Sequence, residues 1–166
     1  QVKWIVDDLK SLGIPYISID LIFAIPGQTL ALIDYDLKKL EELDITHVSY
    51  YSLILEDKTY FYHQYLKGNF TPMSEDDEAI MYDYTMEKLT QMGFEQYEVS
   101  NYAKHQHYSL HNTIYWTLGE YIGVGMGAHG FVDNYRTYNE RGLSQYLDHF
   151  IKEKVLQTED DKLQDE

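Results

Sequence analysis

A nearly continuous apolar run at residues 17–25 (ISIDLIFAI) most limits the folds open to this chain. It holds a single charged residue, which is typical of a strand buried on both faces in a parallel sheet. Apolar side chains then recur at helical spacing, at Leu30, Ile33, Leu37, Leu40 and Leu43. A second strand is expected over residues 48–55. A strand, a helix and a strand within about 40 residues predict a βαβ unit with parallel strands.

Further elements are expected on both sides of this unit. The apolar spacing predicts a helix at residues 4–12, and Ser74 with Asp77 forms a capping pattern at the start of another. Residues 94–99 alternate between polar and apolar and predict a third strand, and a last helix is expected over residues 143–156. The long connections between these elements show little periodicity, so no element is expected in them.

The predicted element order, α-β-α-β-α-β-loop-α, is that of an α/β protein. We expect three consecutive parallel strands over residues 16–99 with helices on the outside, an open segment of a (β/α) TIM-like barrel. Three units are too few to close an eight-stranded barrel, so the pattern indicates a piece of a larger protein. Residues 1–157 are expected to form the barrel portion and a connecting segment, and residues 158–166 a disordered acidic tail.

Charge and cysteine content exclude several functions. The 28 acidic residues outnumber the 13 basic ones, giving a net charge of −15, and such a surface repels the phosphates of nucleic acids. No apolar run approaches the roughly 18 residues of a membrane helix, and no signal peptide is recognisable, so we expect a cytoplasmic protein that is not an integral membrane protein. The chain has no cysteine, so it offers no thiolate for catalysis or for an iron–sulfur cluster and is not expected to be catalytic alone.

Asp20 is the charged residue of the first apolar strand. A carboxylate there costs free energy unless it is paired, hydrogen-bonded or at the ligand-facing end of the strand. Because ligands bind at the carboxyl ends of parallel strands, we predict that Asp20 contacts a ligand. The alternative is a structural aspartate that is hydrogen-bonded to a neighbouring loop.

Histidines cluster in the second half of the chain. His105, His107 and His111, with His129 as a fourth, have a spacing compatible with a metal site. No predicted element places two of these imidazoles on one face, so surface loop histidines are the preferred interpretation.

The segment at residues 111–116 (HNTIYW) combines an imidazole and an amide with two large aromatic side chains. These groups suit a flat, apolar, iron-bearing ligand, since imidazole ligates haem iron and aromatic rings line a macrocycle. The alternative is a loop whose aromatic residues anchor it in the core. Just beyond it, glycines alternate at Gly123, Gly125 and Gly127, which permits close approach of a ligand or of another strand.

Five segments, in order, resemble the motifs of one family. They are residues 20–29 (DLIFAIPGQT, resembling D-L-I-x-G-L-P-G-Q-T), residues 49–53 (SYYSL) with Glu56, residues 93–103 (GFEQYEVSNYA, resembling G-Y-x-x-Y-E-I-S-N-F-A), residues 111–116 (H-N-x-x-Y-W) and residues 121–129 (YIGVGMGAH, resembling Y-x-G-x-G-x-G-A-H). The chain resembles the HemN/HemW family of radical S-adenosylmethionine (SAM) proteins, which comprises oxygen-independent coproporphyrinogen III oxidases and their haem-binding relatives. The resemblance covers residues 14 to about 150.

The resemblance implies a (β/α)6-type barrel whose other half carries a [4Fe–4S] cluster on a C-x3-C-x2-C loop. In the full-length protein it further implies bound SAM. The residue matching Asp20 contacts SAM in the oxidase branch, and the positions aligned with Ile54 and His129 line the same pocket.

The H-N-x-x-Y-W motif distinguishes the HemW branch and implies a haem site. Its residues are His111, Asn112, Tyr115 and Trp116. The resemblance therefore implies part of a haem chaperone in haem and porphyrin metabolism, with haem or porphyrinogen and haem-receiving respiratory proteins as partners. The alternatives are a genuine coproporphyrinogen III oxidative decarboxylase and, from the histidine spacing, a non-enzymatic metal-binding module.

Overall fold

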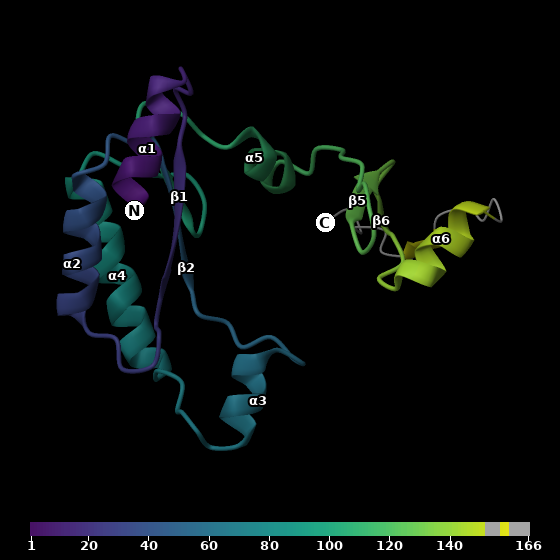
Figure 1. Ribbon diagram of the computed structural model, residues 1–166, viewed down its shortest axis with the longest axis horizontal. Coiled ribbons are helices and arrows are strands. Elements are labelled where there is room, and N and C mark those ends of the chain that lie inside the picture. Colours follow the sequence, from purple (N-terminus) through teal and green to yellow (C-terminus); the bar gives the residue numbers. More distant parts are fainter. Residues whose placement is uncertain (152–156, 160–166) are drawn as a thin grey trace. The chain divides into compact units, whose positions relative to one another are not determined.

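The computed structural model describes residues 1–151 and 157–159, which fall into two compact units divided between Ser109 and Leu110. Unit 1 contains α1 (Val2–Ser11), β1 (Ser18–Phe23), α2 (Leu30–Glu41), β2 (His47–Ser52), α3 (Tyr60–Leu66), α4 (Glu75–Gln91), β3 (Glu95–Gln96) and β4 (Asn101–Ala103). Unit 2 contains α5 (Leu110–Trp116), β5 (His129–Val132), β6 (Tyr135–Tyr138), α6 (Leu143–Ile151) and β7 (Gln157–Glu159). Figure 1 labels most of these elements.

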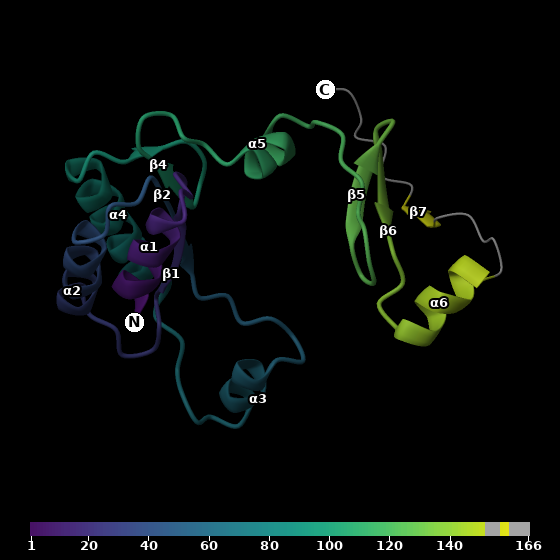
Figure 2. The same cartoon turned by 45° about the horizontal axis from the view of Figure 1, so that its top comes forward.

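The predicted βαβ unit is confirmed. β1 and β2 pair in parallel, with Ile19 opposite Val48, and α2 connects them. α2 buries Ile33, Leu37 and Leu40, three of the residues whose spacing predicts it. α2 and α4 contact each other and lie together on one side of the sheet (Figures 1 and 2). This side holds the hydrophobic core of unit 1.

The expectation of three consecutive parallel strands is wrong at the third strand. The sheet order is β1-β2-β4-β3, and β4 runs antiparallel to both of its neighbours. β3 therefore runs in the same direction as β2, but β4 lies between them. The burial of the side chains explains this order: Tyr102 and Ala103 of β4 are almost fully buried and suit the centre, whereas the polar Glu95 and Gln96 suit the edge.

β1 is buried on one face only, not on both as its composition suggests. Ile19, Leu21 and Phe23 pack in or against the core, whereas the alternate residues Ser18, Asp20 and Ile22 are exposed. α2 and α4 cover one side of the sheet, and the apolar Ile22 is 49% exposed on the other. We call this second side of the sheet the uncovered face.

Two features of unit 1 complete the fold. α3 occurs in the connection expected to lack regular structure; Thr59 caps it by accepting a hydrogen bond from the Tyr62 amide, and none of its residues is buried. Ser74 is the N-cap of α4, as predicted: its hydroxyl accepts from the Asp77 amide at 3.1 Å and donates to the Asp77 carboxylate at 2.6 Å. Gly93, with φ +84°, follows that helix in the left-handed conformation.

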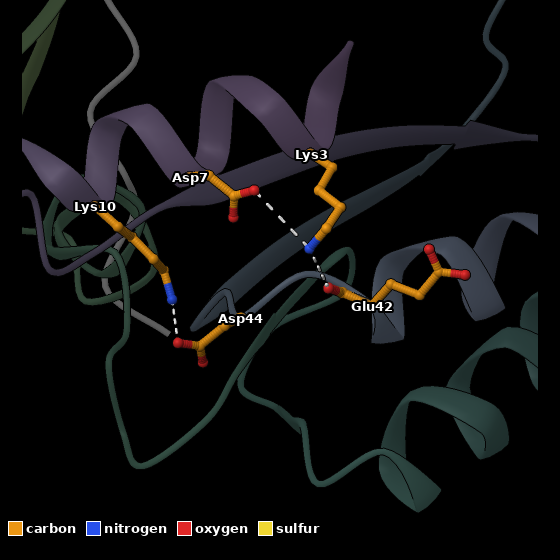
Figure 3. A network of polar contacts seen from close by, with 5 residues as sticks. All are labelled: Lys3, Asp7, Lys10, Glu42 and Asp44. Atoms are coloured by element: carbon orange, nitrogen blue, oxygen red, sulfur yellow. Dashed lines mark hydrogen bonds and ion pairs between the residues drawn. The ribbon is translucent and has the colours of Figure 1, made fainter.

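Polar contacts join α1 to the end of α2 and to the turn that follows it (Figure 3). Lys10 pairs with Asp44, and Lys3 donates to the Glu42 carbonyl at 3.4 Å while lying 4.0 Å from Asp7. The hydrogen bond and positive charge of Lys10 lower the pKa of the Asp44 carboxyl. These exposed contacts orient α1, whose buried residue is Val6 rather than Trp4 or Ile5.

Unit 2 contains an antiparallel sheet in the order β5-β6-β7. Asp133 and Asn134 form the two-residue turn between β5 and β6, and both have positive φ, as a type I′ hairpin turn requires. Residues 157–159 form a strand, whereas residues 152–156 and 160–166, which include part of the predicted last helix and most of the acidic tail, lie outside the described residues. The expected domain boundary at residue 157 stays a prediction. Within the described part of the chain, no helix is long and apolar enough to cross a membrane.

Candidate functional site

Asp20 lies on the uncovered face of the unit 1 sheet. It is opposite Ser49 in β2, and Ser49 is opposite Asn101 in β4, so a carboxylate, a hydroxyl and an amide form a row across three strands. Asp20 is exposed, whereas Ser49 and Asn101 are buried. Asp20 is the third of six residues in β1 and therefore lies mid-strand, not toward the carboxyl end as expected. Its carboxylate is accessible to accept hydrogen bonds from a ligand.

The residues expected to bind SAM are divided between the two units. Ile54 lies two residues beyond the end of β2 and is 74% exposed. His129 is the exposed first residue of β5 in unit 2, with its ring centroid 6.3 Å from that of Tyr138. The shared role of Asp20, Ile54 and His129 stays a prediction.

A buried histidine, His47, lies next to Asp20 and was not identified from the sequence. Its Nδ1 is 2.7 Å from the Ser18 hydroxyl, and its Nε2 is 2.7 Å from the Tyr97 hydroxyl. Burial lowers the pKa of His47, and the nearby carboxylates of Asp20 and Glu98 oppose that shift in part. The sequence contains one signal for His47, the alternation of polar and apolar residues along a strand. His47 and Ser49 alternate with apolar residues, as Ser18 and Asp20 do in β1.

Acidification is expected to destabilise unit 1 through His47. The ordinary pKa of 6.5 applies to the unfolded chain and the folded value is lower, so the unfolded chain binds more protons between the two. The free energy of unfolding should therefore fall as the pH drops below about 6.5. His47→Gln should flatten this dependence in denaturant titrations at several pH values, whereas His105→Gln, at an exposed position, should not. The same pH dependence in His47→Gln and wild type would mean that His47 is not the responsible group.

The helix α5 carries the H-N-x-x-Y-W residues and brings two of their side chains, His111 and Tyr115, together. His111 and Tyr115 are four residues apart and so share one face of the helix. The Tyr115 hydroxyl is 2.7 Å from His111 Nε2, and the two rings are 4.7 Å apart at 79°. His111 is exposed, Tyr115 is 41% exposed and Trp116 is 60% exposed. The alternative of a loop anchored in the core by its aromatic residues is therefore wrong.

Aromatic contacts join α5 to the hairpin of unit 2. Tyr115 packs edge-on against Tyr121 at 4.6 Å, and Tyr121 lies 6.4 Å from the buried Phe131. Tyr121 also forms a β-bridge with Phe131. A Cβ atom at Gly123 would collide with the backbone of His129, so this glycine allows two backbone segments to approach closely.

Two of the histidines whose spacing suggested a metal site, His105 and His107, lie in the segment that precedes α5. Within the described residues, no group of three or more histidine, aspartate or glutamate side chains is placed to hold a metal ion. The rings of His105 and His107 are 6.3 Å apart, and the ring of His107 packs against Tyr16 at 4.6 Å. These are surface contacts of the segment that precedes α5.

Comparison with known proteins defines the class to which this fold belongs. The structure matches that of coproporphyrinogen III oxidase (HemN) from Escherichia coli, a radical SAM enzyme, with a TM-score of 0.73 over 95% of this chain and 39% of that one. The two sequences are 16% identical, so this likeness concerns the fold alone. The chain thus has a mixed α/β fold like that of this radical SAM enzyme.

Sequence relatives specify the family. The chain is 42% identical over 159 residues to the haem chaperone HemW of Lactococcus lactis and 41% identical over 145 residues to that of Bacillus subtilis, covering 96% and 87% of this chain. It is 40% identical over 69% of its length to the mitochondrial radical S-adenosyl methionine domain-containing protein 1 of Danio rerio. No family model matches the chain. The chain belongs to the HemN/HemW family. It spans about two fifths of the length of the first two relatives, 42% and 38%.

Proposed function

We propose that the full-length protein is a radical SAM haem chaperone that binds haem at α5. The observation that carries this proposal is the joint exposure of His111, Tyr115 and Trp116 on one seven-residue helix. An exposed imidazole beside aromatic rings can ligate iron while the rings cover part of a macrocycle. The names of the HemW relatives support the proposal, because two of them match at 42% and 41% identity across this region.

The hydrogen bonds of His111 indicate which nitrogen would bind iron. Tyr115 contacts Nε2, and the structure gives Nδ1 no partner among the described residues. Histidines that ligate metals commonly donate their second ring N–H to a neighbouring group, which fixes the tautomer. We therefore propose that His111 ligates haem iron through Nδ1, while Nε2–H donates to the Tyr115 hydroxyl.

Tyr115→Phe is expected to weaken haem binding by about tenfold, at the lower end of the effect of losing a hydrogen-bond partner of a metal ligand. The ring and its packing on Tyr121 remain, so the variant tests the hydroxyl alone. Haem titration of the full-length variant and wild type measures the effect. Tighter binding by the variant would show that the hydroxyl competes with iron for Nε2.

The proposal extends to SAM at the uncovered face of the unit 1 sheet. We propose that this sheet forms part of a barrel wall with its helices outside, so that Asp20 faces the interior. The exposed carboxylate of Asp20 fits the hydrogen-bond donors of SAM, namely its ammonium group and ribose hydroxyls. The chain has no cysteine, so its residues do not fit an iron–sulfur cluster.

The second candidate is oxidative decarboxylation of coproporphyrinogen III, favoured by the structural likeness to HemN. Two assays on one preparation of the full-length protein separate the candidates: haem titration and conversion of coproporphyrinogen III in the presence of SAM and a reductant. Haem binding without conversion supports the chaperone, and conversion without haem binding overturns it. The chaperone proposal includes a cytoplasmic location and haem-receiving respiratory proteins as recipients.

A further inference from the structure

We propose that Tyr97 and His47 are positioning residues for Ser109, the residue before α5, and that they stabilise the start of this helix through the Ser109 amide. The inference rests on the proposed haem site, because it concerns how that site is held in place. Tyr97 belongs to the turn between β3 and β4, and His47 is the first residue of β2. Neither residue lies in the H-N-x-x-Y-W motif.

A chain of hydrogen bonds leads from the sheet of unit 1 to the residue before α5. The Ser18 hydroxyl contacts His47 Nδ1, and His47 Nε2 contacts the Tyr97 hydroxyl, both at 2.7 Å. The Tyr97 hydroxyl accepts a hydrogen bond from the Ser109 amide at 3.2 Å. His47 is only 7% exposed, so this series of hydrogen bonds is anchored at a buried side chain of the sheet. His111 follows Ser109 by two residues.

The segment between β4 and α5 is fastened to unit 1 at several points. Tyr108 stacks on Tyr97 with ring centroids 4.6 Å apart and 25° between the planes. The Lys104 amide donates to the Thr46 carbonyl at 2.9 Å. His105 and Gln106 both adopt positive φ, of 53° and 59°, which is unfavourable for residues other than glycine. The surrounding contacts therefore hold a turn that the backbone alone disfavours.

α5 is not stable through its own backbone hydrogen bonds alone. It has seven residues and none is buried, and helices this short are unstable without external contacts. Its carboxyl end is held by the packing of Tyr115 on Tyr121 and by the Gly119 amide, which donates to the Ile114 carbonyl at 2.9 Å. Its amino end is continuous with Ser109. The Tyr97 hydroxyl is therefore placed to order Ser109, the residue from which the helix starts.

The test compares Tyr97→Phe with Tyr82→Phe in the full-length protein. Tyr82 is a matched control, because its hydroxyl also bonds to a loop of unit 1, donating to the Val99 carbonyl at 3.0 Å, away from Ser109. Tyr97→Phe should weaken haem binding about 3- to 10-fold, the effect of one lost hydrogen bond. It should also speed amide hydrogen exchange at residues 109–116. Tyr82→Phe should change neither measurement.

A double-mutant cycle with His111→Ala separates positioning from a general effect on the fold. The Tyr97→Phe loss should disappear in the His111→Ala background. Wild-type affinity in Tyr97→Phe, or an equal loss in both backgrounds, overturns the inference and leaves the proposed haem site standing. No effect of His111→Ala alone overturns the proposed haem site itself. If Tyr97→Phe does not fold, Ser109→Pro removes the donating amide instead and should give the same loss of affinity.

Discussion

Leu89→Ala is expected to lower the free energy of unfolding of unit 1 by about 2–5 kcal/mol, the usual cost of removing a fully buried leucine side chain. Leu89 lies on α4, is completely buried and belongs to the main hydrophobic cluster together with Ile33 and Tyr102. The cavity left by the truncation would lie where α4 covers the sheet, so the neighbouring helix could not close it without moving.

Urea unfolding followed by circular dichroism measures this effect. Leu66→Ala provides the matched control, because Leu66 lies on α3 and is 62% exposed. Its effect should stay within about 0.5 kcal/mol, as for most surface substitutions. Equal destabilisation by the two variants would mean that the core is not centred where α2 and α4 meet the sheet.

The βαβ unit could be predicted because local pattern and tertiary packing agree there. Ile33, Leu37 and Leu40 repeat at helical spacing, and the same residues face the sheet. Asp20 lies on the face of β1 that is exposed, whereas the apolar composition of the strand predicts burial on both faces. An apolar strand cannot by itself show whether helices cover one of its sides or both.

Pairing order could not be predicted because it depends on competition between segments. Residues 94–99 alternate as a strand should, but the buried Tyr102 and Ala103 take the place next to β2. A three-residue strand such as β4 leaves no periodic signal of its own. The short helices α3 and α5 escaped prediction for the same reason: each has seven residues and buries none.

The candidate site was predicted in its chemistry rather than in its geometry. The motif indicated an imidazole among aromatic side chains, but not that the Tyr115 hydroxyl occupies Nε2 of His111. His47 was missed because a lone histidine before an apolar strand is a weak signal. Its importance follows from contacts with Ser18 and Tyr97, which are 29 and 50 residues away in sequence.

His111→Ala is expected to weaken haem binding by more than about 100-fold. This exceeds the 10- to 100-fold effect of losing a hydrogen-bond partner of a metal ligand, because the variant removes the ligand itself. The fold should be unaffected, since His111 is exposed and its contact is with Tyr115 on the same helix. Aromatic packing around the macrocycle would remain, so the variant should still bind haem weakly, without ligation of the iron by imidazole.

Titration of the full-length protein with haem, followed by the Soret absorption band, tests this directly in wild type, His111→Ala and His107→Ala. His107 is the control, because it is a neighbouring histidine whose ring packs on Tyr16 rather than on α5. Wild type and His107→Ala should bind haem with the same affinity and the same band position, while His111→Ala should bind more than about 100-fold more weakly and with a shifted band. Equal affinity in all three proteins would show that His111 is a surface histidine and that haem does not bind at α5.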